Sequence, residues 1–178
     1  MQKEFVQHPF QPVYDKHSQI LILGSFPSIV SRKQQFYYMN PQNRFWKILD
    51  ALFHTSFYES TKEEKIKQLK QYHIALYDVI ESCMIVNSSD ASIQNVKPIP
   101  LYQLLKQTEI STIYLNGKTA YQNFLKFFPE LKLYSHLLPS SSSANARYSL
   151  KQLIESWKII QDPLLKQNEL PLKLQLSI

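Results

Sequence analysis

The 178-residue chain is 44% hydrophobic and 19% charged, a composition that fits one globular domain over residues 1–178. No apolar stretch approaches the roughly 20 residues that span a bilayer, and Met1 is not followed by an apolar signal segment, so we expect a cytoplasmic protein with no membrane partner. The single cysteine, Cys83, excludes an intrachain disulfide and an iron–sulfur cluster, while the net charge of +6 suits equally a polyanion-binding face and a merely basic surface.

Strand and helix signals alternate along the chain. Short apolar runs that end at a glycine or a polar residue predict buried strands. Apolar residues at i, i+3, i+4 and i+7 predict helices with one buried face, and Thr61 followed by Glu64 is typical of a capping box. In chain order this predicts a strand over 20–23, a polar and aromatic loop over 25–42, helices over 45–53 and 61–72, a strand over 74–80, a loop over 84–100, a short helix over 101–107, a strand over 112–116, a helix over 120–128, a strand over 131–137 and a helix over 150–157.

This alternation predicts an α/β fold, namely a three-layer αβα sandwich with a short, largely parallel central sheet. The tail over 162–178, which contains Pro163 and Pro171, is of uncertain order: an added edge element or an extension.

The chain has only two glycines, and each follows a predicted strand directly. Gly24 comes after the run that begins at Ile20, and Gly117 comes after Thr112 to Asn116. A sequence that avoids glycine elsewhere keeps it where no side chain is tolerated. In a parallel sheet that place is the carboxyl end of a strand, where a ligand approaches the backbone. The two glycines therefore predict the ligand-binding edge of the sheet.

Three loops should open on this edge, and they are unusually rich in polar and aromatic residues. They are Gly24–Ser28, Phe36–Trp46 and Leu138–Arg147. Judged on its position alone, Asn43 is first of all a candidate N-cap for the helix that follows. The five histidines show no metal-ligand spacing, so we expect no metal site and no cofactor.

The three loops together resemble the uracil-DNA glycosylase superfamily. The segment Asn40-Pro41-Gln42-Asn43-Arg44-Phe45-Trp46 looks like the corresponding stretch of the mismatch-specific uracil glycosylases. The opening Gly24-Ser25-Phe26-Pro27-Ser28 and the ending Leu138-Pro139-Ser140-Ser141-Ser142 look like the hypoxanthine-DNA (deoxyinosine) glycosylase branch. The resemblance extends over residues 20–160.

The resemblance implies a monofunctional DNA glycosylase that flips out a deaminated base, most of all hypoxanthine, and excises it by hydrolysis of the N-glycosidic bond. It further implies a monomer whose partner is DNA with a damaged or deaminated base, without a metal cluster. Two alternatives stay open. One is a uracil or thymine mismatch DNA glycosylase, and the other is a non-catalytic DNA- or nucleotide-binding domain of the same fold.

The resemblance also implies roles for single residues. At the position of Phe26, many superfamily members carry a carboxylate or an amide that handles the attacking water. Phenylalanine at this position matches the hypoxanthine branch. Resemblance to that branch implies that Asn43 is the catalytic residue. Tyr38 is expected to stack on the flipped base, and Asp78 and Ser88-Ser89-Asp90 to border the pocket. The expected base pocket comprises Gly24, Ser25, Phe26, Pro27, Tyr38, Asn40 and Asn116.

The last of the three loops is expected to enter the DNA minor groove. The branch usually has a proline where this chain has Ser143, and Arg147 is either a phosphate contact or a solvated arginine. The expected DNA-binding residues are Ser140, Ser141, Ser142, Ser143, Asn145 and Arg147.

Overall fold

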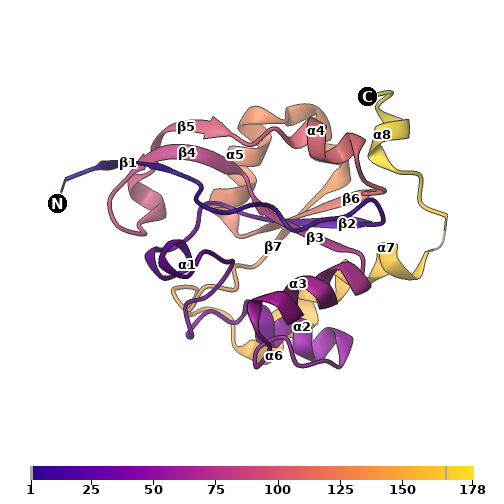
Figure 1. The fold of residues 1–178 in the computed structure, drawn as a ribbon, viewed down its shortest axis with the longest axis horizontal. Helices are drawn as coiled ribbons and strands as arrows, with labels where there is room; N and C mark the ends of the chain where they lie inside the picture. Colours follow the sequence, from indigo (N-terminus) through magenta and orange to yellow (C-terminus); the bar gives the residue numbers. More distant parts are fainter. Residues whose placement is uncertain (1, 167) are drawn as a thin grey trace.

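A four-stranded parallel sheet forms the centre of the molecule (Figure 1). The computed structural model describes residues 2–166 and 168–178. The strand order is β3-β2-β6-β7, so the chain starts in the middle of this sheet and adds strands on both sides. The strands are β2 (Ile20–Gly24), β3 (Ile74–Asp78), β6 (Thr112–Asn116) and β7 (Ser135–Leu138).

Helices cover both faces of this sheet, which confirms the predicted three-layer αβα sandwich. In Figure 1 the helices α2, α3 and α6 lie below the sheet, and α4 and α5 lie above it. Their bounds are α2 (Phe45–Phe53), α3 (Lys62–Gln71), α4 (Leu101–Lys106), α5 (Lys118–Phe127) and α6 (Leu150–Trp157). The predicted capping box is present at the start of α3, where the Thr61 and Glu64 side chains each bond to the other residue's backbone N–H.

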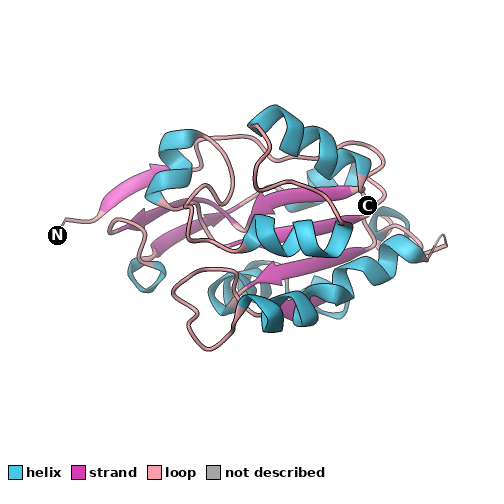
Figure 2. Ribbon diagram, turned by 90° about the horizontal axis from the view of Figure 1, so that it is seen from below, coloured by secondary structure: helices cyan, strands magenta, loops and turns pink. Residues whose placement is uncertain are grey.

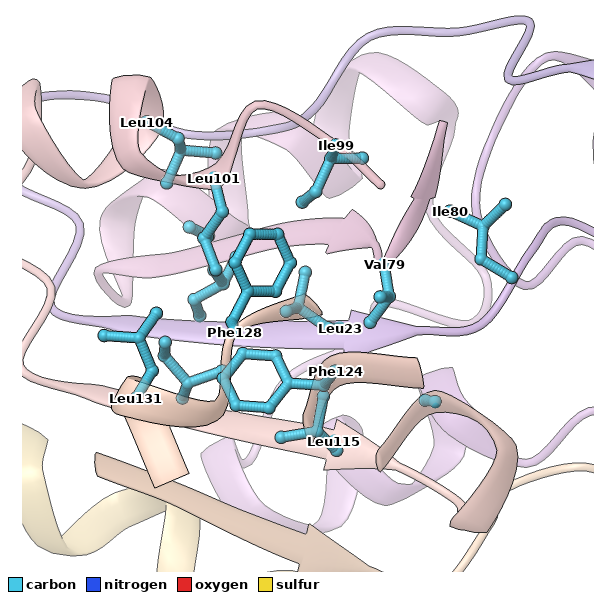
Figure 3. Packing of buried hydrophobic residues seen from close by; sticks show 14 of the residues in the cluster. Leu23, Val79, Ile80, Ile99, Leu101, Leu104, Leu115, Phe124, Phe128 and Leu131 are labelled. Carbon is cyan, nitrogen blue, oxygen red and sulfur yellow. The ribbon is translucent and has the colours of Figure 1, made fainter. Parts of the chain in front are cut away.

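The central strand β2 is apolar throughout because both of its faces are buried. Leu21 and Leu23 pack into one cluster with α5, whereas Ile20 and Ile22 pack into the other with α2 and α6. In Figure 3 the ring of Phe124 lies against Leu115 and that of Phe128 lies near Leu23. Burying one such side chain is worth about 1.5–3 kcal/mol, so this short run anchors both layers.

A second, antiparallel sheet was not predicted. It has the order β1-β4-β5, with β1 (Glu4–Gln7), β4 (Ile80–Ile85) and β5 (Gln94–Pro98). The prediction of a loop over 84–100 was therefore wrong, and β1 was missed. Residues of β1 and β5 are mostly exposed, so they lack the apolar pattern by which a strand is recognised. Backbone pairing to β4 holds both strands in place.

Two more local predictions were wrong. The loop over 25–42 contains a short helix, α1 (Ile29–Gln34), which Ser28 caps. The strand predicted over 131–137 begins only at Ser135, because Pro129–Tyr134 forms a 3₁₀ helix. Leu133 in that helix is 89% exposed, so the alternation of apolar and polar residues there was coincidental.

The tail forms short helices that pack against the rest of the chain. They are α7 (Asp162–Leu165), after a 3₁₀ helix over Lys158–Gln161, and α8 (Leu172–Gln175). Leu172 is fully buried and its N–H donates to the carbonyl of Ile110 at 2.8 Å. Within residues 2–166 and 168–178, no helix has the length and apolar character needed to cross a membrane.

The carboxyl ends of the parallel strands all face one side of the molecule. Figure 2 shows long loops gathered on this side, which is also the side of the N-terminus. One of these loops contains the 3₁₀ helix Asp90–Ser92 between β4 and β5. Parallel α/β sheets bind their ligands at this edge.

Candidate functional site

A cavity of about 450 Å³ opens at the carboxyl edge of the parallel sheet. This volume lies within the range of small-molecule sites. Residues from all three predicted loops line it, so the fold brings them together as expected. The predicted residues that line the cavity are Gly24, Ser25, Phe26, Pro27, Tyr38, Asn40, Asn43, Asn116, Ser140, Ser141 and Ser142, and those that do not are Ser143, Asn145 and Arg147.

Gly24 forms part of the cavity wall because no larger residue fits there. A Cβ atom at this position would lie 2.4 Å from Asp78 Oδ1 and 2.8 Å from the Tyr38 hydroxyl oxygen. Both distances are far below van der Waals contact, and the obstructing groups are themselves buried. The absence of a side chain at Gly24 therefore lets a carboxylate and a phenol converge on the wall.

Gly117 is required for a different reason. Its φ of +98° is a backbone conformation that residues with a Cβ avoid. Its N–H donates to the carbonyl of Leu138 at 3.0 Å, and a Cβ here would lie 3.1 Å from that of Ser140. The loop over residues 139–148, which contains four consecutive serines, is called the serine loop below. Gly117 thus lets the start of this loop approach the end of β6.

The side-chain oxygen of Asn43 uses both of its lone pairs to accept hydrogen bonds from the protein. It accepts hydrogen bonds from the backbone N–H of Phe45 at 3.0 Å and from the hydroxyl of Ser141 at 2.8 Å. Because a backbone N–H can only donate, the atom that faces it must be the oxygen, and this fixes the orientation of the amide. The NH₂ group makes no hydrogen bond to any described residue. The N-cap of α2 is Arg44, so the prediction that Asn43 caps this helix was wrong by one residue. Asn43 instead satisfies the first N–H of α2 with its oxygen and keeps a free donor on the cavity wall.

Ser141 connects Asn43 to Asn116. The side chain of Ser141 is fully buried, its hydroxyl accepts from Asn116 Nδ2 at 2.9 Å, and its N–H donates to Asn116 Oδ1 at 2.9 Å. These bonds hold two pocket amides in fixed positions. Sequence reasoning treated the four serines of this loop alike, and only the packing distinguishes Ser141.

The ring of Tyr38 lies on the ring of Phe45, with centroids 4.0 Å apart and planes 22° from parallel. Its hydroxyl is buried and has no hydrogen-bond partner in the described part of the chain. Burial raises the pKa of Tyr38 and the Asp78 carboxylate raises it further, so the phenol stays neutral. The φ of +53° is strained for this residue type, and such strain is concentrated at functional sites.

Asp78 lies at the carboxyl end of β3 and lines the cavity, as expected. Its Oδ2 is 2.8 Å from Nε2 of His8, and Nδ1 of His8 is 2.9 Å from the carbonyl of Phe10. The side chains of His8 and Asp78 are 1% and 5% exposed. Sequence reasoning gave His8 no role, because nothing in the sequence links it to a strand end 70 residues away.

Arg44 holds the serine loop. Its Nη2 donates to the carbonyls of Ser142 at 2.5 Å and Asn145 at 3.1 Å, and Nη1 donates to the carbonyl of Tyr148. The backbone N–H and Nε of Arg44 both donate to the carbonyl of Ser141, at 3.1 and 3.3 Å. One arginine thus satisfies four carbonyls of a loop whose tip is exposed. Sequence reasoning used Arg44 only as part of a motif.

The other predicted residues have simpler surroundings. Phe26 is a buried ring on the cavity wall, and Ser25 donates its hydroxyl to Asp90 Oδ1 at 3.2 Å. The Asn40 side-chain oxygen accepts from the N–H of Gln42, a turn interaction. Arg147 lies exposed beyond the cavity.

Metal ligands are not grouped in this site. In the part of the chain that the structure describes, no cluster of three or more His, Cys, Asp or Glu side chains could hold a metal ion. The chemically active groups of the cavity are amides, hydroxyls and the carboxylates of Asp78 and Asp90.

Fold and site together define an α/β protein with a pocket of fixed amides, an aromatic wall and a buried carboxylate at the carboxyl edge of a parallel sheet. The chain belongs to the uracil DNA glycosylase superfamily, whose family model matches residues 11–162.

Individual relatives agree with this assignment. The chain is 33% identical over 159 residues to a hypoxanthine DNA glycosylase of Methanosarcina acetivorans, covering 87% of this chain and 98% of the relative. It is 31% identical over 152 residues to a hypoxanthine DNA glycosylase of Methanosarcina barkeri, covering 83% and 93%. The solution NMR structure of a candidate uracil DNA glycosylase from Methanosarcina acetivorans superposes with a TM-score of 0.78 at 30% identity, covering 92% of this chain and 100% of that one.

Proposed function

We propose that the protein is a monofunctional DNA glycosylase that flips a deaminated base, above all hypoxanthine, into the cavity and hydrolyses its N-glycosidic bond. The names of the two Methanosarcina relatives support hypoxanthine as the base. The observation that carries the catalytic assignment is the free NH₂ group of Asn43 on the wall of a cavity that three loops of a glycosylase fold enclose.

The reaction breaks the bond between C1′ of the sugar and N9 of the base. The bonding electrons leave with the base, and a water oxygen then bonds to C1′ and loses a proton, which the departed base anion takes up. In this proposal the Asn43 NH₂ group donates a hydrogen bond either to the departing base or to the oxygen of the water. Such a fixed donor stabilises charge that develops in the transition state without reorganising. Ser141 and the N–H of Phe45 hold the donor in place.

The pocket walls would hold the flipped base. We propose that Tyr38 offers a ring face for stacking, since Phe45 supports this ring from one side. Phe26 adds a second apolar wall. The exposed tip of the serine loop, with Ser143 and Arg147, would meet the DNA strand outside the cavity. Stacking on an aromatic ring is worth about 1–3 kcal/mol per base, enough to offset much of the cost of unstacking.

We further propose that the enzyme works as a monomer in the cytoplasm. Three loops of one copy line the cavity. The net charge of +6 suits a polyanionic partner.

The test is excision from duplex oligonucleotides that carry one deoxyinosine, deoxyxanthosine, deoxyuridine, mismatched thymine or no lesion. Strands are analysed with and without hot alkali, which cleaves at abasic sites. We expect alkali-dependent cleavage that is fastest for deoxyinosine. Faster cleavage at uracil or mismatched thymine would favour the mismatch enzyme. Binding without cleavage of any substrate would identify a non-catalytic domain. Cleavage without alkali would contradict a monofunctional enzyme.

A further inference from the structure

The His8–Asp78 pair lies at the cavity wall, and the catalytic proposal does not use it. Its two members come from the N-terminal segment after β1 and from the end of β3. The rings of Phe10, Phe26, Tyr37 and Tyr77 surround His8. A buried carboxylate is costly unless it is paired and hydrogen-bonded, so the pair needs an explanation.

The hydrogen bonds of His8 fix which oxygen of Asp78 is used. The carbonyl of Phe10 can only accept, so Nδ1 of His8 carries a proton, and Nε2 faces Asp78 Oδ2. If Asp78 is ionised, Nε2 donates to Oδ2. If Asp78 is protonated, the proton lies on Oδ2 and is donated to Nε2. In both arrangements the other oxygen, Oδ1, carries no proton and is an acceptor.

Oδ1 of Asp78 is unused by the protein. It lies over Gly24, 2.4 Å from where a Cβ would stand, and no described residue donates a hydrogen bond to it. Asp78 lines the cavity, so a bound molecule can reach this oxygen. The wall therefore presents one oriented acceptor, on a side chain that is 5% exposed, to which no described residue donates, and this favours a ligand that can donate to it.

We propose that Asp78 Oδ1 reads the ring N–H that deamination creates in a base, with His8 as the residue that positions the carboxylate. This inference rests on the proposed function. A base in the cavity is still joined to DNA through N9, which must stay at the mouth, so its far edge with N1 and C6 points inward. In adenine N1 is a bare acceptor, whereas in hypoxanthine it is an N–H donor. Asp78 would accept from hypoxanthine and repel the lone pair of adenine.

Recognition of a ring N–H has consequences for uracil and for guanine. Uracil also carries a ring N–H, at N3, where cytosine has a bare acceptor, so Asp78 separates deaminated bases from their parents rather than purines from pyrimidines. Guanine carries an N1–H as well, so its exclusion must depend on other groups, such as those that meet its 2-amino group. A site built around one hydrogen bond rejects the analogue that lacks the donor far better than an apolar pocket rejects an isostere.

The test measures binding separately from chemistry. Duplexes carry either 2′-fluoroarabino-deoxyinosine or 2′-fluoroarabino-deoxyadenosine, whose fluorine slows bond cleavage, and dissociation constants are compared for the parent, Asp78→Asn and Asp78→Leu. We expect the parent to prefer inosine by about 10- to 100-fold, as for a hydrogen bond to a charged group. Asp78→Leu should bring the two constants within about threefold of each other.

Asp78→Asn should keep most of the preference. The neutral His8 Nε2 accepts from the new NH₂ group, so the amide oxygen takes the place of Oδ1. The matched control is Glu81→Gln, which removes a carboxylate on the adjoining strand that pairs with Lys97 and lies outside the cavity. This control should bind and excise like the parent.

Several outcomes would overturn the inference. A folded Asp78→Leu variant that keeps the full preference for inosine would do so. If that variant does not fold, the parent is tested with 1-methyl-deoxyinosine, which lacks the N–H; binding as tight as that of inosine would equally reject the role of Asp78. By contrast, a parent that excises no inosine while showing the predicted binding preference would contradict the proposed function and not this inference.

His8 is tested through its partner. His8→Leu should lower the inosine-to-adenine binding ratio, and it should have little further effect when combined with Asp78→Leu, because both changes remove the same oriented acceptor. A merely structural histidine would weaken binding of both duplexes alike. Additive losses in the double variant would show that His8 does not act through Asp78.

Discussion

At the scale of single residues, the orientation of one amide decides what Asn43 can do. Its oxygen is held by the N–H of Phe45 and the hydroxyl of Ser141, so it cannot also accept a proton from an attacking water. Only the NH₂ group is left for the substrate. Arg44, and not Asn43, is the N-cap of α2, but Asn43 still satisfies the first N–H of that helix with its oxygen. This structural role and a role in the site are compatible, because each uses a different atom.

Two substitutions at this residue separate those roles. Asn43→Asp keeps an oxygen for the N–H of Phe45 but removes the NH₂ donor, whereas Asn43→Ala removes both. We expect single-turnover excision to fall about 100- to 1000-fold in both variants, the usual cost of losing one fixed transition-state donor. Only Asn43→Ala should also lose stability, by about 1 kcal/mol for the lost hydrogen bond from the N–H of Phe45.

Excision rates, melting temperatures and duplex affinities measure these effects. Duplex affinity should stay within a few-fold of the parent in both variants, because the phosphate contacts lie outside the cavity. An Asn43→Asp variant that excises inosine at the parental rate would show that the donor is not needed, and Asn43 would then only support the start of α2.

At the scale of elements, the serine loop depends on the segment that precedes α2. The tip of this loop, which contains Ser143, is exposed. What holds it is the guanidinium of Arg44, which donates to four of its carbonyls, and the buried hydroxyl of Ser141. Arg44 also adjoins Asn43 in the chain. The loop and the Asn43 amide are thus positioned by one connected set of hydrogen bonds.

Arg44→Lys should show that the shape of the guanidinium matters and not its charge alone. Lysine keeps the charge but cannot reach carbonyls on several sides at once. We expect a loss of about 1.5–3 kcal/mol of stability, typical for hydrogen bonds to a charged donor, and faster proteolysis within residues 141–148. Excision should fall with it, and added guanidinium should partly restore the activity of Arg44→Ala.

Arg147→Lys is the matched control for this loop, since Arg147 is exposed and lies outside the cavity. It should leave proteolysis and melting temperature unchanged. If Arg44→Lys behaves like this control, the hydrogen bonds of Arg44 do not hold the loop.

Most elements with a buried face could be predicted from the sequence. The strand β4 is largely buried but was missed, because Glu81 and Ser82 interrupt its apolar pattern. The strand β2 and helix α2 carry continuous or periodic apolar residues because they pack on the core. The strands β1 and β5 are mostly exposed and owe their conformation to backbone pairing with β4, which leaves no apolar pattern. The same reason explains why Gly24 and Asn43 were placed at the cavity and His8 was not: β1 delivers His8 to the end of β3.

At the scale of the whole molecule, the fold assembles the cavity from distant parts of one chain. His8 meets Asp78, Arg44 meets the carbonyl of Tyr148, and Asn43 meets Ser141. The edge of the sheet is the one place where these segments can converge. The net charge is also a property of the whole molecule, because in the proposed function the surface around the cavity would bind the phosphates of the duplex.

The net charge of +6 predicts that duplex binding depends on salt. Each phosphate that a lysine or arginine neutralises contributes about −0.9 to the slope of log affinity against log salt concentration. An enzyme of one domain that also holds a flipped base should make only a few such contacts, so we expect a moderate slope. Arg147→Ala should make the slope shallower by about one if this residue meets a phosphate. Lys70→Ala is the control, because Lys70 is exposed at the end of α3 that leads into the opposite, amino-terminal edge of the sheet.

Free deoxyinosine should be hydrolysed negligibly, since remote phosphate contacts supply the energy that unstacks the base. A slope near zero, or efficient cleavage of the free nucleoside, would place this pocket in nucleoside metabolism and not in DNA repair.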